Sequence, residues 1–150
     1  MNSTAHYRPP VNRSDRFFNT AVRWLADHGV NLAGAQTLTV LGRTSGTPQR
    51  TPVNPLTIDG REYLVAPRGN TQWVRNARVA GGGELRRGRR SRTVRLVEVA
   101  AEQRVPILRS YLDKWGWEVS RFLPEGLDTD ADDTTLAEYA DALPVFEVLS

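Results

Sequence analysis

Residues 42–53 read Gly-Arg-Thr-Ser-Gly-Thr-Pro-Gln-Arg-Thr-Pro-Val and follow the apolar run Leu38-Thr39-Val40-Leu41. This order predicts a strand, a tight turn and a second extended segment. The turn offers backbone N–H groups, hydroxyls and guanidinium forks at one place. These are the groups that bind phosphate and carboxylate. The stretch therefore predicts a site for an anionic ligand beside a β-hairpin.

Further strands and turns are expected on both sides of this stretch. Pro52 and Pro55 fall inside an extended segment, so that segment either pairs fully on one edge or contains a bulge. Asp59-Gly60 is typical of a two-residue hairpin turn, and Gly88 lies between two further strand-like runs. The expected strands are residues 36–42, 50–58, 61–66, 83–87, 91–99 and 144–149.

The first helix is predicted over residues 14–28, with Ser14 as its N-cap and apolar residues at helical spacing. Such a helix covers one face of a sheet, or it contacts a membrane surface through its aromatic side chains. Peripheral membrane contact through residues 14–28 is therefore a second hypothesis for this segment.

Three more helices are expected further along the chain. The first starts at Asn70 or Thr71, the second at Pro106, and the third at Asp132 or Asp133. The second has an apolar face that consists of Ile107, Leu108, Tyr111, Leu112 and Trp115. Short strands with flanking helices predict a mainly β fold of the α+β class, closed or strongly curved. No Gly-x-Gly-x-x-Gly follows a strand and opens a helix, which disfavours a dinucleotide fold.

Length and composition narrow the function classes. The chain has 150 residues, which predicts one domain over 1–150 with a loose tail at 1–13. It has no cysteine, and its two histidines lack ligand-like spacing, so no metal site is expected. No apolar run reaches the ~20 residues that span a bilayer, and the first thirty residues lack the apolar core of a signal peptide. A cytoplasmic protein is expected, with membrane association open through residues 14–28.

Charge is unevenly distributed along the chain. Nine of the arginines fall between Arg68 and Arg95, and nine of the 17 acidic residues fall between Asp113 and Asp141. One part of the fold should therefore be basic and another acidic, and the basic part can attract a polyanion. No aromatic residue interleaves the run Arg86–Arg92, so base stacking has no platform there and nucleic-acid binding is not expected.

Two further features join the 42–53 turn as candidates for the site. Arg68-Gly69-Asn70 leads from a strand into a helix, where free N–H groups can meet an anion. Trp73 and Asn76 lie three residues apart on one helical face. Trp73 either stacks on a planar ring or is a core tryptophan. Asn76 either bonds a ligand amide or hydroxyl, or contacts backbone at a helix end.

Taken in order, these motifs resemble a known family. Gly-Arg-Thr-Ser-Gly-x-Pro-x-Arg-Thr-Pro-Val, an Asp-Gly hairpin, Arg-Gly-x-x-x-Trp-Val-Arg-Asn and Pro144-Val145-Phe146 are similar to the actinobacterial deazaflavin-dependent nitroreductases. The resemblance covers residues 36–99 and the last strand. It implies a split β-barrel of the flavin- and deazaflavin-reductase type. It also implies binding of coenzyme F-420, an 8-hydroxy-5-deazaflavin with a phosphate and an oligoglutamate tail.

The resemblance also implies which residues bind the cofactor. Phosphate or tail carboxylates would be held by Arg43, Thr44, Ser45, Gly46 and Arg50, and the phosphate region by Arg68 and Gly69. The deazaflavin edge would meet Pro52 and Val53, and the pocket would be closed by Trp73 and Asn76. Many family members carry Lys or Arg where this chain has Thr44, and the loop before Trp73 is short. Arg75, Arg78 or the cluster at 86–90 would compensate for the lost charge.

The implied reaction is hydride transfer from reduced F-420 to a small electron-poor acceptor such as a quinone, an enone or a nitroaromatic compound. The cofactor performs that chemistry, so no catalytic residue is assigned. Tyr111 is a candidate proton donor or a core residue, and Trp115 and Trp117 belong to the substrate pocket or the core. The alternatives are a barrel that binds FMN and a barrel that binds a cofactor or lipid without turnover. Both a monomer and a homodimer suit such a barrel.

Overall fold

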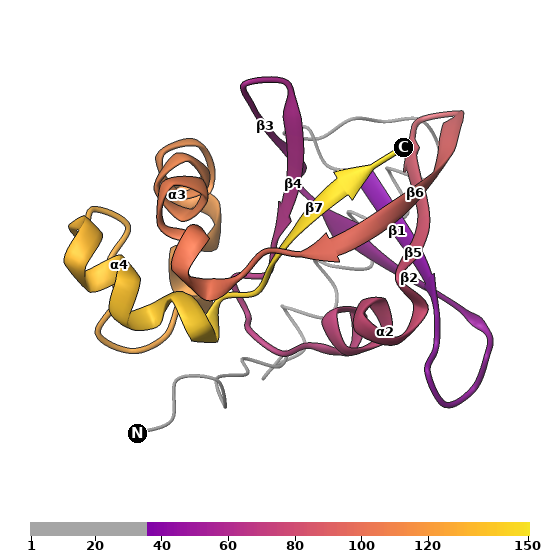
Figure 1. Ribbon diagram of the computed structural model, residues 1–150, viewed down its shortest axis with the longest axis horizontal. Coiled ribbons are helices and arrows are strands. Elements are labelled where there is room, and N and C mark those ends of the chain that lie inside the picture. The colour runs from indigo at the N-terminus through magenta and orange to yellow at the C-terminus, as the bar shows by residue number, and fades with distance from the viewer. Residues whose placement is uncertain (1–35) are drawn as a thin grey trace.

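Seven antiparallel strands form one curled sheet in the computed structural model, which describes residues 36–150 (Figure 1). The predicted tail at 1–13 and helix at 14–28 lie outside the described residues. The sheet has the order β2-β1-β5-β6-β7-β4-β3 and curves into a half-barrel with flanking helices. The strands are β1 (Gln36–Leu41), β2 (Pro48–Val53), β3 (Leu56–Ile58), β4 (Arg61–Val65), β5 (Gly82–Arg87), β6 (Arg90–Glu98) and β7 (Val145–Leu149).

The hairpins form where the sequence predicts them. β1 and β2 pair from Gln36 opposite Val53 to Leu41 opposite Pro48. Within the described residues β2 pairs with β1 alone, so its prolines lie on an edge strand, where a missing N–H is tolerated. Asp59 and Gly60 have φ values of 51° and 78°, the left-handed backbone of a tight hairpin turn.

The last strand occupies a central place in the sheet. β7 pairs with β6 on one side and with β4 on the other, so it joins the two halves of the sheet. Its Phe146 side chain is 1% exposed. The N–H of Ala66 donates to the carbonyl of Pro144, which extends the β4–β7 contact beyond the strands. The C-terminal segment is therefore part of the core of the fold.

Within residues 36–150, three α-helices flank the sheet: α2 (Gln72–Ala80), α3 (Val105–Val119) and α4 (Asp133–Tyr139). α2 starts after Thr71 and ends at Gly81, whose φ of 72° suits a glycine C-cap. Pro106 lies in the first turn of α3. Asp132 caps α4 by accepting the N–H of Thr135 at 2.8 Å. Short 3-10 turns lie at η2 (Ala101–Gln103), η3 (Ser120–Phe122) and η4 (Ala140–Ala142).

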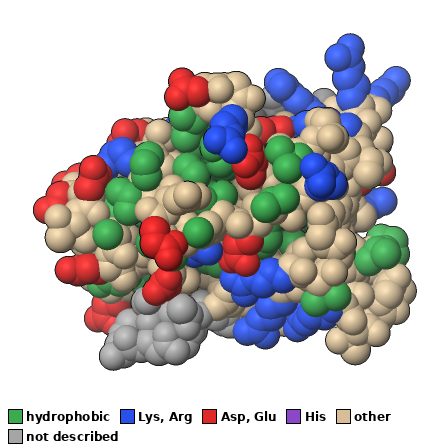
Figure 2. Space-filling view, in the orientation of Figure 1, with side chains coloured by type: hydrophobic (Ala, Val, Ile, Leu, Met, Phe, Trp, Pro, Cys, Tyr) green, Lys and Arg blue, Asp and Glu red, His purple; other side chains and the backbone are tan. Residues whose placement is uncertain are grey.

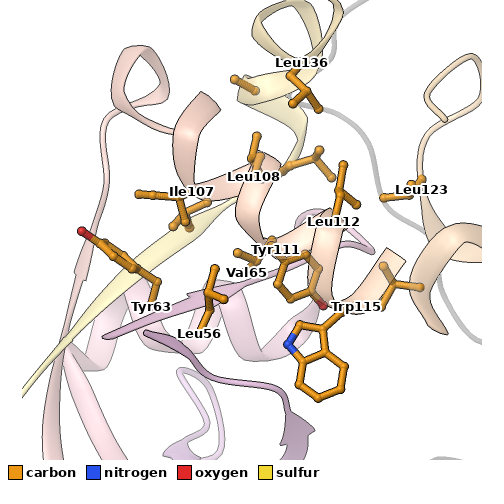
Figure 3. Close-up of a cluster of buried hydrophobic side chains, with 14 of the residues drawn as sticks. Leu56, Tyr63, Val65, Ile107, Leu108, Tyr111, Leu112, Trp115, Leu123 and Leu136 are labelled. Carbon is orange, nitrogen blue, oxygen red and sulfur yellow. The ribbon is translucent and has the colours of Figure 1, made fainter. Parts of the chain in front are cut away.

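Among the described residues, two hydrophobic clusters lie on the two faces of the sheet. Alternation along β4 places Leu64 in the cluster beneath α2, and Tyr63 and Val65 in the cluster beneath α3 and α4. The second cluster contains the predicted apolar face of α3, and Figure 3 shows Tyr111 and Trp115 extending from that helix toward the sheet. Trp117, in contrast, is 74% exposed.

The two charge regions of the sequence also separate in space. Figure 2 shows Lys and Arg side chains projecting at the tip of the β5–β6 hairpin and gathered around α2, whereas Asp and Glu lie over α3 and α4. Within the described part of the chain, the helices are too short or too polar to cross a membrane.

Candidate functional site

The β1–β2 turn is closed by its own backbone. Gly42 N–H donates to the Thr47 carbonyl at 2.8 Å, and Gly46 N–H donates to the Gly42 carbonyl at 2.9 Å. A side chain at position 42 would meet Ser45 Oγ at 2.5 Å, and Gly46 has a φ of 70°. The left-handed backbone of Gly46 favours glycine there, whereas a side chain at position 42 would require Ser45 to change its rotamer. Thr44, Ser45 and Gly46 are exposed at its tip.

Asn76 on α2 anchors this turn. Its Oδ1 accepts the backbone N–H of Arg43 at 3.0 Å and Arg43 Nη1 at 2.8 Å. Arg43 Nη1 also donates to Gln72 Oε1 at 2.9 Å, so the arginine side chain runs along the helix. Asn76 is only 4% exposed. This contact with the backbone is made to the β1–β2 turn and not at a helix end, where the sequence predicted it as the alternative to a ligand contact.

Trp73 lies one turn earlier on α2, where it connects the site to the core. Its ring centroid is 5.7 Å from that of Phe146, with the rings inclined by 49°. The side chain is half-buried and packs against the cluster beneath α2. One part of the indole therefore belongs to the core, and the remainder is exposed beside the turn.

Arg68 and Gly69 lie on the path from β4 to α2, as expected. Gly69 is buried, has a φ of 86° and donates its N–H to the Ala66 carbonyl at 3.1 Å. The Arg68 guanidinium carbon lies 3.9 Å above the Phe122 ring, a cation–π contact with η3. The segment thus brings a positive charge against the helical side of the molecule.

The remaining predicted residues are distributed along β2. Arg50 is exposed, Pro52 is half-buried and Val53 is buried in the cluster beneath α2. From Pro48, which follows the turn, to Val53 the strand rises by about 17 Å. Val53 therefore lies well away from the turn. The structure therefore brings the turn and α2 together, and it places Pro52 and Val53 at the other end of β2. An elongated ligand with a charged end at the turn matches this arrangement.

Arg78 and Glu98 form a structural ion pair near the site. Arg78 Nε and Nη2 bond the two Glu98 oxygens at 2.9 and 2.8 Å, and Arg78 Nη1 donates to Asn70 Oδ1 at 3.0 Å. The hydrogen bonds to Glu98 raise the pKa of Arg78 above its ordinary value. Because its donors are used inside the protein, Arg78 is poorly placed to hold a cofactor tail.

A pocket of about 700 Å³ lies at the β5–β6 hairpin end of the sheet. The sequence did not predict this pocket, although it showed a run of arginines here, Arg86-Arg87-Gly88-Arg89-Arg90. Its lining includes Glu62, Arg87, Arg90, Arg92, Lys114 and Trp115. Arg92 Nη2 lies 2.6 Å from Glu62 Oε1, an ion pair that spans from β6 to β4. No local pattern joins these residues, because they come from four different elements.

Comparison with known proteins decides the family. A family model described as "F420H(2)-dependent quinone reductase" matches residues 14–116. The chain belongs to this family. A search of curated proteins found no matching sequence. Family membership supports an oxidoreductase that uses coenzyme F-420.

Solved structures share the fold at low sequence identity. A protein of unknown function from Agrobacterium tumefaciens is 17% identical with a TM-score of 0.52; the match covers 93% of this chain but only 57% of that protein. A structure described as a domain-swapped dimer is 17% identical with a TM-score of 0.53, over 91% and 99% of the two chains. An F420-H2 dependent reductase is 17% identical with a TM-score of 0.51, over 77% and 93%. The half-barrel thus matches the fold of an F-420-dependent reductase.

Proposed function

We propose that this member of the F-420-dependent quinone reductase family reduces an electron-poor small molecule with a hydride from reduced F-420. The anchored β1–β2 turn is the observation that supports this most directly. It holds Arg43 against α2 and leaves Thr44, Ser45 and Gly46 exposed at the turn. A rigid, donor-rich turn of this kind suits phosphate or carboxylate. When bound, the deazaflavin supplies the hydride chemistry, and the protein supplies binding and orientation.

The chain's own residues divide this task along β2. Arg43, Thr44, Ser45, Gly46 and Arg50 would hold the phosphate or the oligoglutamate tail, with Arg68 and Gly69 at the phosphate region. Backbone groups of Pro52 and Val53 would line the deazaflavin edge. Trp73 would close the pocket with its exposed part, and Asn76 would act by keeping the turn in place. The length of β2 between the two ends suits a cofactor with a charged tail and a planar ring.

A quinone is the acceptor that the family description favours, and an enone or a nitroaromatic compound is an alternative. Tyr111 is 3% exposed and packs in the cluster beneath α3. Its burial favours the core role over proton donation. Water is then the proton source that we expect for the reduced acceptor.

The deciding experiment is a fluorescence titration of the protein with oxidised F-420, with FMN as the parallel ligand. Arg43→Ala should weaken F-420 binding about tenfold or more, since a charge-assisted hydrogen bond contributes ~1.5–3 kcal/mol. Arg95→Ala is the matched control, because Arg95 is exposed on β6, which β5 separates from β1. Unchanged affinity in folded Arg43→Ala protein would remove Arg43 from the site.

Each other outcome of the titration identifies a rival. Binding of FMN alone would make the protein a flavin reductase of the same fold. Binding of F-420 without reduction of any quinone would favour a cofactor-binding barrel without turnover. Binding of neither would contradict the proposal. One related structure is described as a domain-swapped dimer, so sedimentation of the same samples should distinguish a monomer from a homodimer.

A further inference from the structure

The pocket at the β5–β6 end of the sheet has the size of a ligand site. Its volume of about 700 Å³ falls in the range of ~300–1,000 Å³ typical of small-molecule pockets. It adjoins the predicted ring end of the cofactor site, since Gln36 lines it and pairs with Val53. Pro55, two residues beyond Val53, also lines it. A ligand here would lie next to the deazaflavin edge and far from the β1–β2 turn.

Two arginines at this pocket have no acidic partner among the described residues. Arg87 and Arg90 stand directly opposite each other across β5 and β6, and like charges in that position are destabilising. Both line the pocket and are exposed, and neither side chain makes a hydrogen bond or ion pair with another described residue. The charge of Arg92 is balanced by Glu62 at 2.6 Å. A bound anion would relieve the repulsion that the protein itself leaves in place.

Leu85 and Trp115 add apolar surface to the pocket, and Lys114 adds a further positive charge. Leu85 is paired with Arg92 and precedes Arg87 by two residues, so all three lie on one face of the sheet. Trp115 lines the pocket from α3 and is 6% exposed. The exposed remainder of its indole ring is therefore small, and the ring serves as an apolar wall. Lys114 Nζ lies 5.3 Å from the Trp115 ring centroid and brings a further positive charge.

We propose that this pocket binds the acceptor and selects organic anions, with Arg87 and Arg90 holding a carboxylate or sulfonate group on an aromatic acceptor. The reaction in this inference rests on the proposed function. The binding of an organic anion rests on the pocket residues alone. A quinone acceptor gains one hydride from reduced F-420, which is thereby oxidised, and one proton from water to give the hydroquinone.

The first test measures binding without cofactor. Isothermal titration should show that 2-naphthoate binds the protein at least tenfold more tightly than its neutral analogue 2-naphthylmethanol. In the double variant Arg87→Gln/Arg90→Gln this preference should disappear, whereas Arg95→Gln should retain it. The double variant should also melt at the same temperature as the parent or higher, because a repulsive pair is removed. Equal binding of the two naphthalenes to the parent protein would overturn the proposal.

The second test compares acceptors at saturating reduced F-420. The double variant should raise KM for 1,4-naphthoquinone-2-sulfonate about tenfold and leave KM for 1,4-naphthoquinone unchanged. A proportional rise for both acceptors would contradict anion selection.

Competition separates this proposal from the cofactor assignment. If oxidised F-420 displaces 2-naphthoate, and the double variant weakens both ligands equally, the arginines hold the cofactor tail and the acceptor proposal fails. If 2-naphthoate binds as expected but F-420 does not, the anion site stands and the proposed function fails.

Discussion

Asn76 shows how a single buried side chain can organise a site that it does not itself present. Its Oδ1 accepts two hydrogen bonds from Arg43, which lies 33 positions earlier in the chain. The amide is buried, so removal of its oxygen would leave a backbone N–H without a partner. The β1–β2 turn would then lose its attachment to α2. At this scale, the proposed anion site depends on a residue that contributes position rather than charge.

We therefore expect Asn76→Ala to weaken two properties together. The free energy of unfolding should fall by about 1–3 kcal/mol, which is the penalty for an unsatisfied buried polar group. F-420 should also bind about tenfold less tightly, because the turn is no longer ordered before binding. Chemical denaturation and fluorescence titration measure the two effects. Val79→Ala is the control, because Val79 is exposed on the same helix. A variant that matched this control in both assays would show that the turn holds its shape without Asn76.

At the scale of elements, the end of β6 links two helices. Glu98 bonds Arg78 of α2 and also accepts from Arg104 Nη2 at 3.1 Å. Arg104, which immediately precedes α3, donates in addition to the carbonyls of Val99 and Ala140, each at 2.8 Å. Burial lowers the pKa of Arg104, against the opposing effect of Glu98. This arginine therefore holds the entry of α3 to the sheet and to η4.

Arg104→Met should destabilise the protein strongly. The change removes one of the two arginine partners of Glu98 and the donors to two carbonyl groups, and each buried acceptor left without a partner costs about 1–3 kcal/mol. Urea denaturation should show a lower midpoint with little change in slope. Arg95→Met, at an exposed position on β6, should remain near the parent. A midpoint for Arg104→Met equal to that control would mean that packing alone positions α3.

The start of α4 predicts a pH effect. The hydrogen bond from Thr135 N–H lowers the pKa of Asp132 below its ordinary 3.8. A lowered folded pKa means that the cap stabilises above that ordinary value and is lost as the pH falls through the folded value. The melting temperature of Asp132→Ala should therefore lie below that of the parent at neutral pH, and the gap should narrow in acid. Asp132→Asn retains a cap without charge, so its melting temperature should show little of this pH dependence. If the difference in melting temperature between Asp132→Ala and the parent stayed constant in acid, the prediction would be wrong.

At the scale of the whole molecule, the C-terminal strand holds the sheet together. β7 stands between β6 and β4, and β3 pairs with β4. Phe146 on this strand is buried in the cluster beneath α2 and touches Trp73 at the site. The integrity of the half-barrel and the wall of the cofactor site therefore depend on the last residues of the chain.

Phe146→Ala should lower the free energy of unfolding by about 3–5 kcal/mol through the cavity that it leaves. Since Trp73 rests on that ring, the near-ultraviolet circular dichroism should also change in the folded variant. Val97→Ala, half-exposed on the neighbouring strand, should alter neither property by more than about 1 kcal/mol. A small effect of Phe146→Ala would show that the two halves of the sheet associate without this contact.

The sequence by itself determined many of the local elements. A hairpin turn is predicted by Asp59-Gly60, a helix end by Gly81, and helix starts by Pro106 and Asp132. These signals are local because backbone preferences and caps act over a few residues. The prolines of β2 predicted either an edge position or a bulge, and the structure shows the edge position. The glycine- and hydroxyl-rich turn indicated an anion site, and the motif order indicated the family to which the chain belongs.

Only the tertiary structure decided which distant residues meet. No periodic or local sequence pattern predicts three of these contacts. They are the position of β7 between β6 and β4, the hydrogen bonds between Asn76 and Arg43, and the pocket that Arg87 and Arg90 share with Trp115. Asn76 in a helix is compatible with a ligand contact or with a backbone contact, and a basic hairpin is compatible with solvent. Burial and strand register resolve such choices, because they depend on contacts between elements far apart in the sequence.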